Sequence, residues 1–154
     1  MFAKEIMTID PVVLSPGQTV DEVHHILSVE HYHHLPVVEH GKLVGLVSDR
    51  DLLKTLSPFF GTDQESSRDR DQMTLKVVDI MSTNLVTVDR HTSVDCASIL
   101  LLEHKISCLP VVDDAYCLEG VLTWKDLLQF YVYQTEDITS DSYEEALNYV
   151  SLGA

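Results

Sequence analysis

The chain alternates between two kinds of hydrophobic pattern. Apolar residues at helical spacing predict a helix from about Val20 to Glu30, and Thr19 with Glu22 predicts a capping box at its start. Two short apolar runs, Leu35 to Val38 and Lys42 to Ser48, are separated by turn residues and predict a β-hairpin. A leucine-containing helix follows. With a brief apolar strand before the first helix, the order is β-α-β-β-α, which is typical of a layered α/β fold.

The same pattern occurs a second time. The segment 35–38, Leu-Pro-Val-Val, recurs at 109–112, a shift of 74 positions, and Ile6-Met7 recurs with the same shift as Ile80-Met81. The segment 45–53 recurs at 120–128, a shift of 75. Internal repeats fix the architecture of a chain. The second copy predicts a strand at 86–88, a helix from the cap Ser93 to Lys105, strands Cys108 to Val112 and Leu118 to Thr123, and a helix from Trp124 to about Tyr133.

These patterns divide the chain into four parts. We expect repeat one at 1–57, a flexible charged linker at 58–74, repeat two at 75–133 and an acidic tail at 134–154. Within the tail, Tyr143, Ala146, Leu147 and Val150 have helical spacing, so both a short helix and a frayed end remain open. A repeat of roughly 55 residues is marginal for a core of its own. The two repeats are therefore expected to pack together.

Composition narrows the class of protein. The chain is 45% hydrophobic, enough for a core, and its net charge of −15 argues against binding to nucleic acids or anionic membranes. No apolar run reaches the roughly 18 residues of a membrane helix, and the first residues do not resemble a signal peptide. Cys96, Cys108 and Cys117 are odd in number and lack metal-binding spacing, which predicts reduced, mostly buried thiols in the cytoplasm.

One short motif carries chemistry in both copies. It has the form Gly-apolar-apolar-Ser/Thr-x-x-Asp, with Ser48 and Asp51 in repeat one and Thr123 and Asp126 in repeat two. A hydroxyl at the start of a helix suits a phosphate group, and a carboxylate one turn later suits a ribose diol. The alternative is that both pairs are only helix caps. Recurrence beside the same Leu-Pro-Val-Val strand favours the nucleotide interpretation.

These residues carry a family resemblance. The chain resembles a tandem pair of cystathionine β-synthase (CBS) domains, the regulatory unit called a Bateman module, over about 1–57 and 75–133. It is also similar to bacterial CBS proteins of the acetoin-utilisation type. The resemblance implies two β-α-β-β-α units related by a pseudo-two-fold axis, with clefts that bind adenosine-containing ligands: AMP, ADP, ATP (with or without Mg²⁺) or S-adenosylmethionine.

The resemblance also implies the candidate site residues. The hydroxyls of Ser48 and Thr123 would contact phosphate, and Asp51 and Asp126 would contact ribose. Adenine would lie between the first strand of a repeat and the segment that precedes its Leu-Pro pair. The full ligand-binding set is Val12, His33, His34, Pro36, Ser48, Arg50, Asp51, Val86, Ser107, Cys108, Pro110, Thr123, Lys125 and Asp126.

Two features qualify the expected ligand. His33 and His34 stand where the family commonly has small residues, so they either crowd the first cleft or stack on a ring. Cations near the clefts are few: Arg50 and Lys125 lie inside the motifs, Lys4 and Lys76 just before the opening turns, and Lys105 near the second pocket. The charge balance therefore slightly favours a monophosphate or a neutral adenosyl ligand over a triphosphate. No cofactor is expected to be essential.

Other functions fit less well. The histidines at 24, 25, 31, 33, 34 and 40 invite a metal site, but solvated loop and helix-end histidines are favoured because the spacing is not that of a zinc site. No nucleophile and base occur together, so an enzyme is not expected, and no catalytic residue is predicted. Trp124, Phe130, Tyr131 and Tyr133 are expected to pack rather than to stack on a ligand. Exposed apolar faces on the second helix of each unit predict a homodimer that signals to an unidentified partner protein. The alternative is an interaction module whose clefts stay empty.

Overall fold

The computed structural model describes residues 1–30 and 32–134. Its helices and strands follow the predicted order. They are η1 (Ala3–Glu5), β1 (Thr8–Ile9), α1 (Val20–Glu30), β2 (His34–Glu39), β3 (Lys42–Ser48), α2 (Asp49–Thr55), α3 (Ser67–Asp71), η2 (Gln72–Thr74), α4 (Val77–Ile80), α5 (Val94–His104), β4 (Cys108–Val112), β5 (Leu118–Thr123) and α6 (Trp124–Gln134), where η marks a 3-10 helix.

Local capping residues fix where the helices begin. At α1, the backbone N–H of Thr19 donates to Glu22 Oε2 at 2.7 Å, and the N–H of Glu22 donates to Thr19 Oγ1 at 3.3 Å. At α5, Ser93 Oγ accepts from the backbone N–H of Cys96 at 3.2 Å. Each of these bonds satisfies a backbone donor that the helix leaves unpaired. The predicted capping box at Thr19 and Glu22 is confirmed.

Two antiparallel hairpins form the centre of the fold. Strands β2 and β3 pair with each other, as do β4 and β5, and both hairpins shift register at the same place, after Val37 and after Val111. The sequence pattern predicted a short strand at 12–14, before α1, and another at 86–88, before α5. The structure has no continuous strand at either place. The residues there form single parallel bridges, from Leu14 to Val37 and from Val88 to Val111. The repeats are therefore alike in backbone detail.

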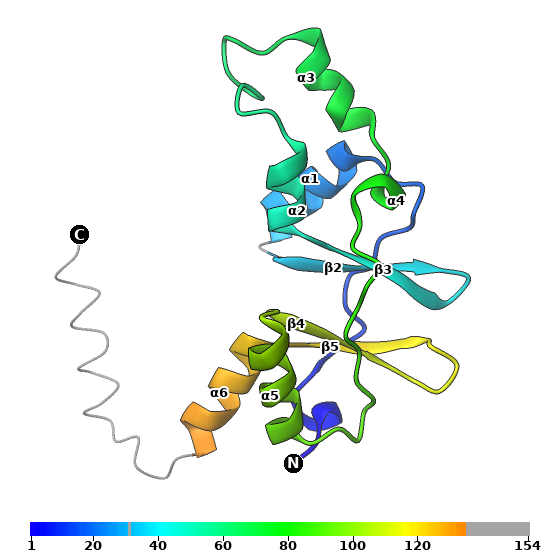
Figure 1. Ribbon diagram of the computed structural model, residues 1–154, viewed down its shortest axis with the longest axis vertical. Helices are drawn as coiled ribbons and strands as arrows, with labels where there is room; N and C mark the ends of the chain where they lie inside the picture. The colour runs from blue at the N-terminus through cyan, green and yellow to red at the C-terminus, as the bar shows by residue number, and fades with distance from the viewer. Residues whose placement is uncertain (31, 135–154) are drawn as a thin grey trace, which may run out of the picture.

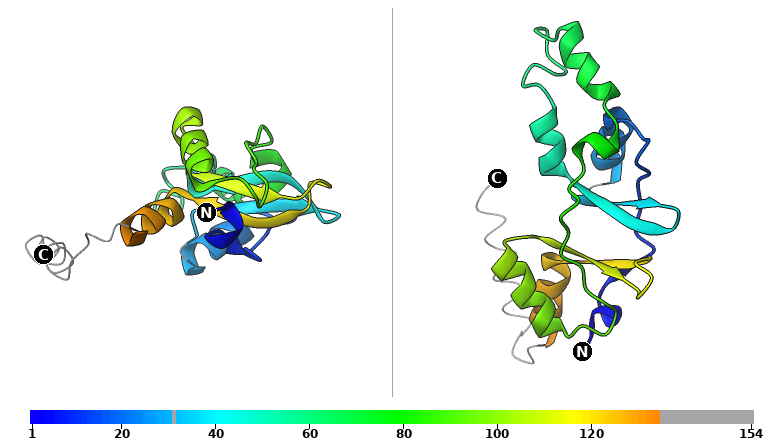
Figure 2. Two further views of the ribbon diagram at one scale, coloured as in Figure 1. Left: turned by 90° about the horizontal axis from the view of Figure 1, so that it is seen from below. Right: turned by 45° about the vertical axis from the view of Figure 1, so that its right-hand side comes forward.

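The hairpins separate two groups of helices. Helices α1, α2 and α4 lie on one side and α5 and α6 on the other (Figure 1; Figure 2, right). The hairpin tips are tied together, because the N–H of Leu43 donates to the carbonyl of Tyr116 at 3.1 Å. The structure is thus an α/β pair of repeats that pack against each other, as predicted.

The opening turn of each sequence repeat packs in the other half of the molecule. Ala3 is fully buried in the core of repeat two, where Met7 also packs, and β1 pairs with β5 of that repeat. Conversely, Val77 is fully buried in the core of repeat one, and Ser82 bridges to Leu46 of β3. Two chain segments therefore cross between the halves, which sequence repetition did not indicate.

The motif glycines allow this crossing. A Cβ at Gly120 would lie 2.7 Å from the carbonyl oxygen of Thr8 and 2.8 Å from Met7 Sδ. A Cβ at Gly45 would clash in the same way with the side chain of Met81. Both contacts are too close for a side chain. Each glycine is therefore the docking point for a crossing Ile-Met segment.

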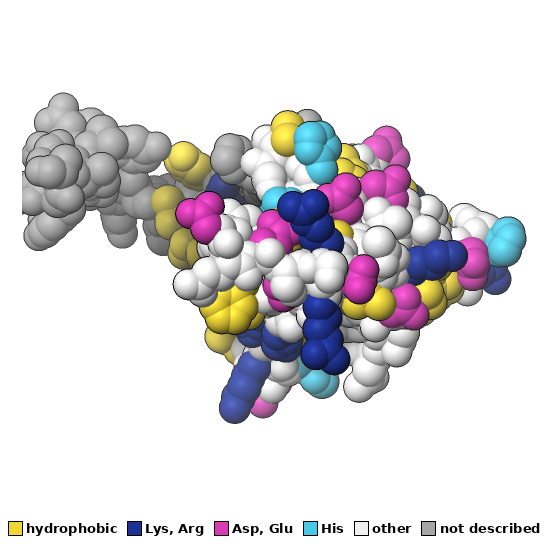
Figure 3. Space-filling model, turned by 90° about the horizontal axis from the view of Figure 1, so that it is seen from above, with side chains coloured by type: hydrophobic (Ala, Val, Ile, Leu, Met, Phe, Trp, Pro, Cys, Tyr) yellow, Lys and Arg dark blue, Asp and Glu magenta, His cyan; other side chains and the backbone are white. Residues whose placement is uncertain are grey.

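The segment between the repeats contains structure that its composition did not predict. Helix α3 and η2 occupy residues 67–74, and Met73 is buried in the core of repeat one. At this end of the molecule, acidic and basic side chains lie interspersed (Figure 3). The helix considered for 143–150 lies outside the described residues. Among the described helices, none has the length and apolar character needed to cross a bilayer.

Candidate functional site

A cleft of about 540 Å³ lies between the two repeats. This volume is within the range of small-molecule sites, which is roughly 300–1,000 Å³. Repeat one contributes the start of α2 and the residues before β2, and repeat two contributes the start of β4 and the segment leading to it. Nine residues predicted from the sequence line it: His33, His34, Ser48, Arg50, Asp51, Val86, Ser107, Cys108 and Pro110.

Five predicted residues do not line this cleft: Val12, Pro36, Thr123, Lys125 and Asp126. Pro36 is fully buried among core residues. Thr123 pairs with Cys108 across the β4–β5 hairpin, and Trp124 is the residue of the second motif that lines the cleft. The cleft therefore combines the hydroxyl and carboxylate of repeat one with the apolar wall of repeat two.

Ser48 and Asp51 are bonded to each other. The Ser48 hydroxyl donates to Asp51 Oδ2 at 2.7 Å, the Ser48 N–H donates to the same oxygen at 2.9 Å, and the Asp51 N–H donates to Ser48 Oγ at 3.2 Å. This is a capping box for α2. Oδ1 of Asp51 accepts no hydrogen bond from the described residues, so it is free to accept one from a ligand.

The second motif has the same geometry. The Thr123 hydroxyl and N–H donate to Asp126 Oδ2 at 2.6 and 2.7 Å, and the Asp126 N–H donates to Thr123 Oγ1 at 3.4 Å. Both motifs are thus helix caps in this structure. Capping and ligand binding use the same residue types, so one does not exclude the other.

A hydrogen bond crosses the cleft between the repeats. His34 Nε2 and Ser107 Oγ are 2.9 Å apart, and both side chains are partly buried. Burial lowers the pKa of His34 below its usual 6.5, although the nearby Asp49 carboxylate acts in the opposite direction. The neighbouring His33 instead bonds Asp49 Oδ2 through Nδ1 at 3.0 Å and is exposed. The two predicted histidines therefore have different surroundings.

Cys108 forms an apolar part of the wall. Burial, together with the nearby Asp126 carboxylate, raises the pKa of its thiol to about 12. The thiol is therefore neutral and unreactive at physiological pH. Cys96 is exposed and Cys117 intermediate, so the expectation of mostly buried thiols holds only for Cys108.

Several lining residues were absent from the candidate set. Lys54 and Asp49 come from α2, Lys105 follows α5, and Trp124 begins α6. Lys54 is four residues from Arg50, which places both on one helix face, and this spacing was a usable signal. Trp124 was expected to pack within the protein, but 55% of it is exposed and it lines the cleft.

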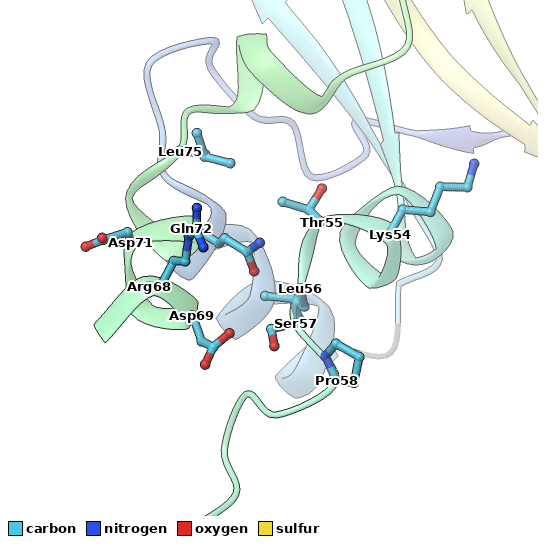
Figure 4. A pocket seen from close by; sticks show the side chains of 10 residues that line it. All are labelled: Lys54, Thr55, Leu56, Ser57, Pro58, Arg68, Asp69, Asp71, Gln72 and Leu75. Carbon is cyan, nitrogen blue, oxygen red and sulfur yellow. The ribbon is translucent and has the colours of Figure 1, made fainter. Parts of the chain in front are cut away.

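A second cavity, of about 590 Å³, lies between the end of α2 and the linker helix α3. It is lined by groups of both charges, including Arg68 and Asp69, and by Gln72, whose Oε1 is buried without a hydrogen-bond partner in the described chain. The Lys54 side chain extends away from the others (Figure 4) and also lines the inter-repeat cleft. None of the predicted site residues lies in this cavity.

The histidines do not gather into a metal site within the described ranges. Across 1–30 and 32–134, no three His, Cys, Asp or Glu side chains come together as metal ligands would. His24 instead packs edge-on against Phe60. His31 lies outside the described residues.

Comparison with known proteins identifies the repeats. The CBS domain family model matches residues 3–58 and 77–133, which is most of the chain. The protein belongs to the CBS domain family. The predicted resemblance to a tandem CBS pair is confirmed.

Solved structures of CBS proteins share the fold and carry ligands. CBSX2, solved in complex with AMP, is 31% identical, with 86% of this chain and 96% of that one covered and a TM-score of 0.72. The CBS domain pair of MJ0100, solved with 5-methylthioadenosine and S-adenosyl-L-methionine, is 26% identical over 88% of this chain and 98% of that one, with a TM-score of 0.70.

Two further proteins are similar to this chain over most of its length. A putative acetoin utilization protein (AcuB) from Vibrio cholerae is 27% identical, with a TM-score of 0.73 and coverage of 88% and 93%. The uncharacterized protein MJ1225 from Methanocaldococcus jannaschii is 26% identical over 82% of this chain. The chain spans only 46% of that relative.

Proposed function

We propose that this protein is a regulatory sensor that binds an adenosine-containing ligand in the cleft between its repeats. The observation that carries the proposal is the composition of the cleft. Ser48 and Asp51, which carry a hydroxyl and a carboxylate, line the same cleft as the apolar residues Val86, Cys108 and Pro110. A purine suits such a wall, and a ribose diol suits a carboxylate acceptor. The adenosine ligands of CBSX2 and of the MJ0100 pair support the same class.

The cleft lies between repeats, so a ligand can change their relative orientation. His34 and Ser107 already form one bond across it, and a ligand contacting both repeats would add others. A ligand shifts such an equilibrium only by its preference for one arrangement. The proposed output is a surface change read by a partner protein, with no catalytic step. The three free cysteines are consistent with action in the cytoplasm.

Isothermal titration calorimetry with AMP tests the proposal. Asp51→Ala should weaken binding at least tenfold, because the carboxylate beside Ser48 is lost. This substitution also removes a capping box, so Glu22→Ala is the matched control: it removes the equivalent carboxylate at α1, away from the cleft. Each should destabilise the fold by about 0.5–2 kcal/mol, while only Asp51→Ala should change AMP affinity. Equal affinities for the two variants would reject the site.

A second candidate function is an interaction module with an empty cleft. It is favoured by the capping boxes, which satisfy both motif hydroxyls internally, and by the His34–Ser107 bond across the cleft. A thermal-shift screen with AMP, ADP, ATP, S-adenosylmethionine and 5-methylthioadenosine, each with and without Mg²⁺, separates the two. A ligand that binds only the folded state raises the melting temperature by mass action. No shift with any compound favours the empty module.

A further inference from the structure

The cavity of about 590 Å³ between the end of α2 and the linker helix α3 has no part in the proposed function. Residues 54–58 form one of its walls, and residues between 68 and 75 form the other (Figure 4). The CBS family model leaves residues 59–76 unmatched, so the second wall belongs to the segment that joins the repeats. The cavity is therefore a candidate site that the repeated pattern does not explain.

The linker wall of this cavity is anchored to repeat one. Met73 is buried in the core of that repeat, and the carbonyl of Leu75 accepts a hydrogen bond from the Val20 N–H at 2.8 Å. At the start of α3, the hydroxyl and the N–H of Ser66 both donate to Asp69 Oδ2 at 2.7 Å. These contacts hold a polar segment against the end of α2, so the cavity has defined walls.

The cavity is lined by two positive and two negative side chains, Lys54 and Arg68 with Asp69 and Asp71. Among residues 1–30 and 32–134, none of these four side chains forms an ion pair. Hydrogen bonding, chiefly to the Ser57 side chain, lowers the pKa of Asp69, so its carboxylate is charged at neutral pH. A ligand that bears one positive and one negative group would match this lining better than a simple anion or a simple cation.

Gln72 is a polar residue to which the fold offers no partner. Its Oε1 is buried and accepts no hydrogen bond from the described chain. An unpaired buried acceptor is unfavourable, so a nonpolar side chain of similar size would suit the fold better. The Gln72 side chain lines the cavity, and rotation of its amide toward the cavity would bring the oxygen to a donor on a ligand. Gln72 follows Arg68 by four residues, which places the two on one side of the linker segment.

We propose that this cavity binds a free α-amino acid with an apolar side chain. Arg68 would hold the carboxylate through charge-assisted hydrogen bonds, and Asp69 and Gln72 would accept from the ammonium group. The rest of the lining includes Leu56, Pro58 and Leu75, which suit an aliphatic or aromatic side chain. The inference does not depend on the proposed function, because it concerns a different cavity.

The test is calorimetry on the full chain with L-alanine, L-valine, L-leucine, L-isoleucine, L-methionine and L-phenylalanine. At least one should bind with a Kd below about 1 mM. For that amino acid, two analogues separate the charges: the carboxylic acid without the amino group, and the amine without the carboxylate. Each should bind at least about tenfold more weakly, because each loses one charged contact.

Arg68→Gln should weaken binding of the amino acid at least about tenfold, since the partner of the carboxylate is lost. Arg70→Gln is the matched control: it removes the same charge from the same helix, but Arg70 pairs with Glu65 and does not line the cavity. It should leave the affinity unchanged. Neither arginine lines the inter-repeat cleft, so AMP binding should be the same in both variants.

Gln72→Met tests the amide separately from the fold. Binding of the amino acid should weaken about three- to tenfold, while the melting temperature stays level or rises because the unpaired buried oxygen is gone. A lower melting temperature with unchanged affinity would contradict the role given to Gln72. Absence of binding by all six amino acids, equal binding of either analogue, or equal affinities of Arg68→Gln and Arg70→Gln would overturn the proposal.

Discussion

At the scale of single residues, the tightest constraint lies at the two motif glycines. Gly120→Ala should destabilise the protein by about 1–3 kcal/mol, because the new Cβ would clash with the Thr8 carbonyl oxygen and the Met7 side chain. The Thr8 oxygen belongs to the backbone, so it cannot move aside as a flexible side chain can. Urea denaturation measures the change. Gly17→Ala is the control, since nothing lies within 4 Å of its Cβ position. Equal stability of the two variants would contradict the close packing described here.

His34 makes stability depend on pH. Its pKa is lowered in the folded protein, so its contribution is fully present above pH 6.5 and is lost as the pH falls through 6.5 toward the lower folded value. His34→Gln keeps a side chain able to bond Ser107 but removes the titration. The variant should therefore lose less stability than the parent between pH 7.5 and 5.5, as measured by urea unfolding. Parallel pH profiles for the two proteins would argue against a buried, neutral His34.

The candidate site was only partly predictable from single residues. Ser48 and Asp51 were found because their spacing is repeated at Thr123 and Asp126. The sequence could not tell caps from ligand groups, since both roles need the same hydroxyl and carboxylate one turn apart. Lys105 was placed near the second pocket from its position before the Leu-Pro strand, whereas Lys54 and Trp124 were missed because their position in the cleft depends on how α2 and α6 pack, which is a property of tertiary structure.

At the scale of elements, the crossing segments can be tested separately. Met7→Ala should loosen the repeat-two half, and Met81→Ala the repeat-one half, each by about 2 kcal/mol from the cavity left behind. Hydrogen–deuterium exchange locates the effect. We expect faster exchange in β4 and β5 for Met7→Ala and in β2 and β3 for Met81→Ala. Loosening of the half that adjoins each methionine in sequence would contradict the crossing.

Elements with a strong local pattern were predicted closely. Helix α1 and strands β3, β4 and β5 match their expected bounds because their periodicity and turn residues are local signals. Strand β1 was not predicted, since two residues carry no period and the strand forms only by pairing with β5. Helix α3 was not predicted, because its residues are polar or charged and show no apolar periodicity. Repeat alignment shows which segments are alike, but not which half each segment joins.

At the scale of the whole molecule, α5 and α6 present apolar side chains to solvent. Leu102 is 76% exposed and Leu128 53% exposed, and the two helices are held together by the Tyr131 hydroxyl, which donates to Asp95 Oδ1 at 2.8 Å. Exposed apolar faces of this kind favour association. We propose that this helical face contributes to a homodimer.

Light scattering after gel filtration tests the dimer. Leu102→Glu combined with Leu128→Glu should shift the protein from dimer to monomer, because the charges would be buried unpaired at the contact. Val13→Glu serves as a control, since Val13 is exposed but lies on neither helix. A monomeric parent protein would disprove the proposed assembly.

The exchanged opening turns limit how the chain can be divided. A fragment ending at residue 57 would lack Met73, Val77 and Met81, which fill the interior of its own half, while retaining Ala3 and Met7 with nothing to cover. Such a fragment should fail to fold. Adding the separate fragment 58–134 should restore structure, because each piece carries what the other is missing. The two halves are thus mutually dependent, because the interior of each is completed by a segment that the sequence assigns to the other.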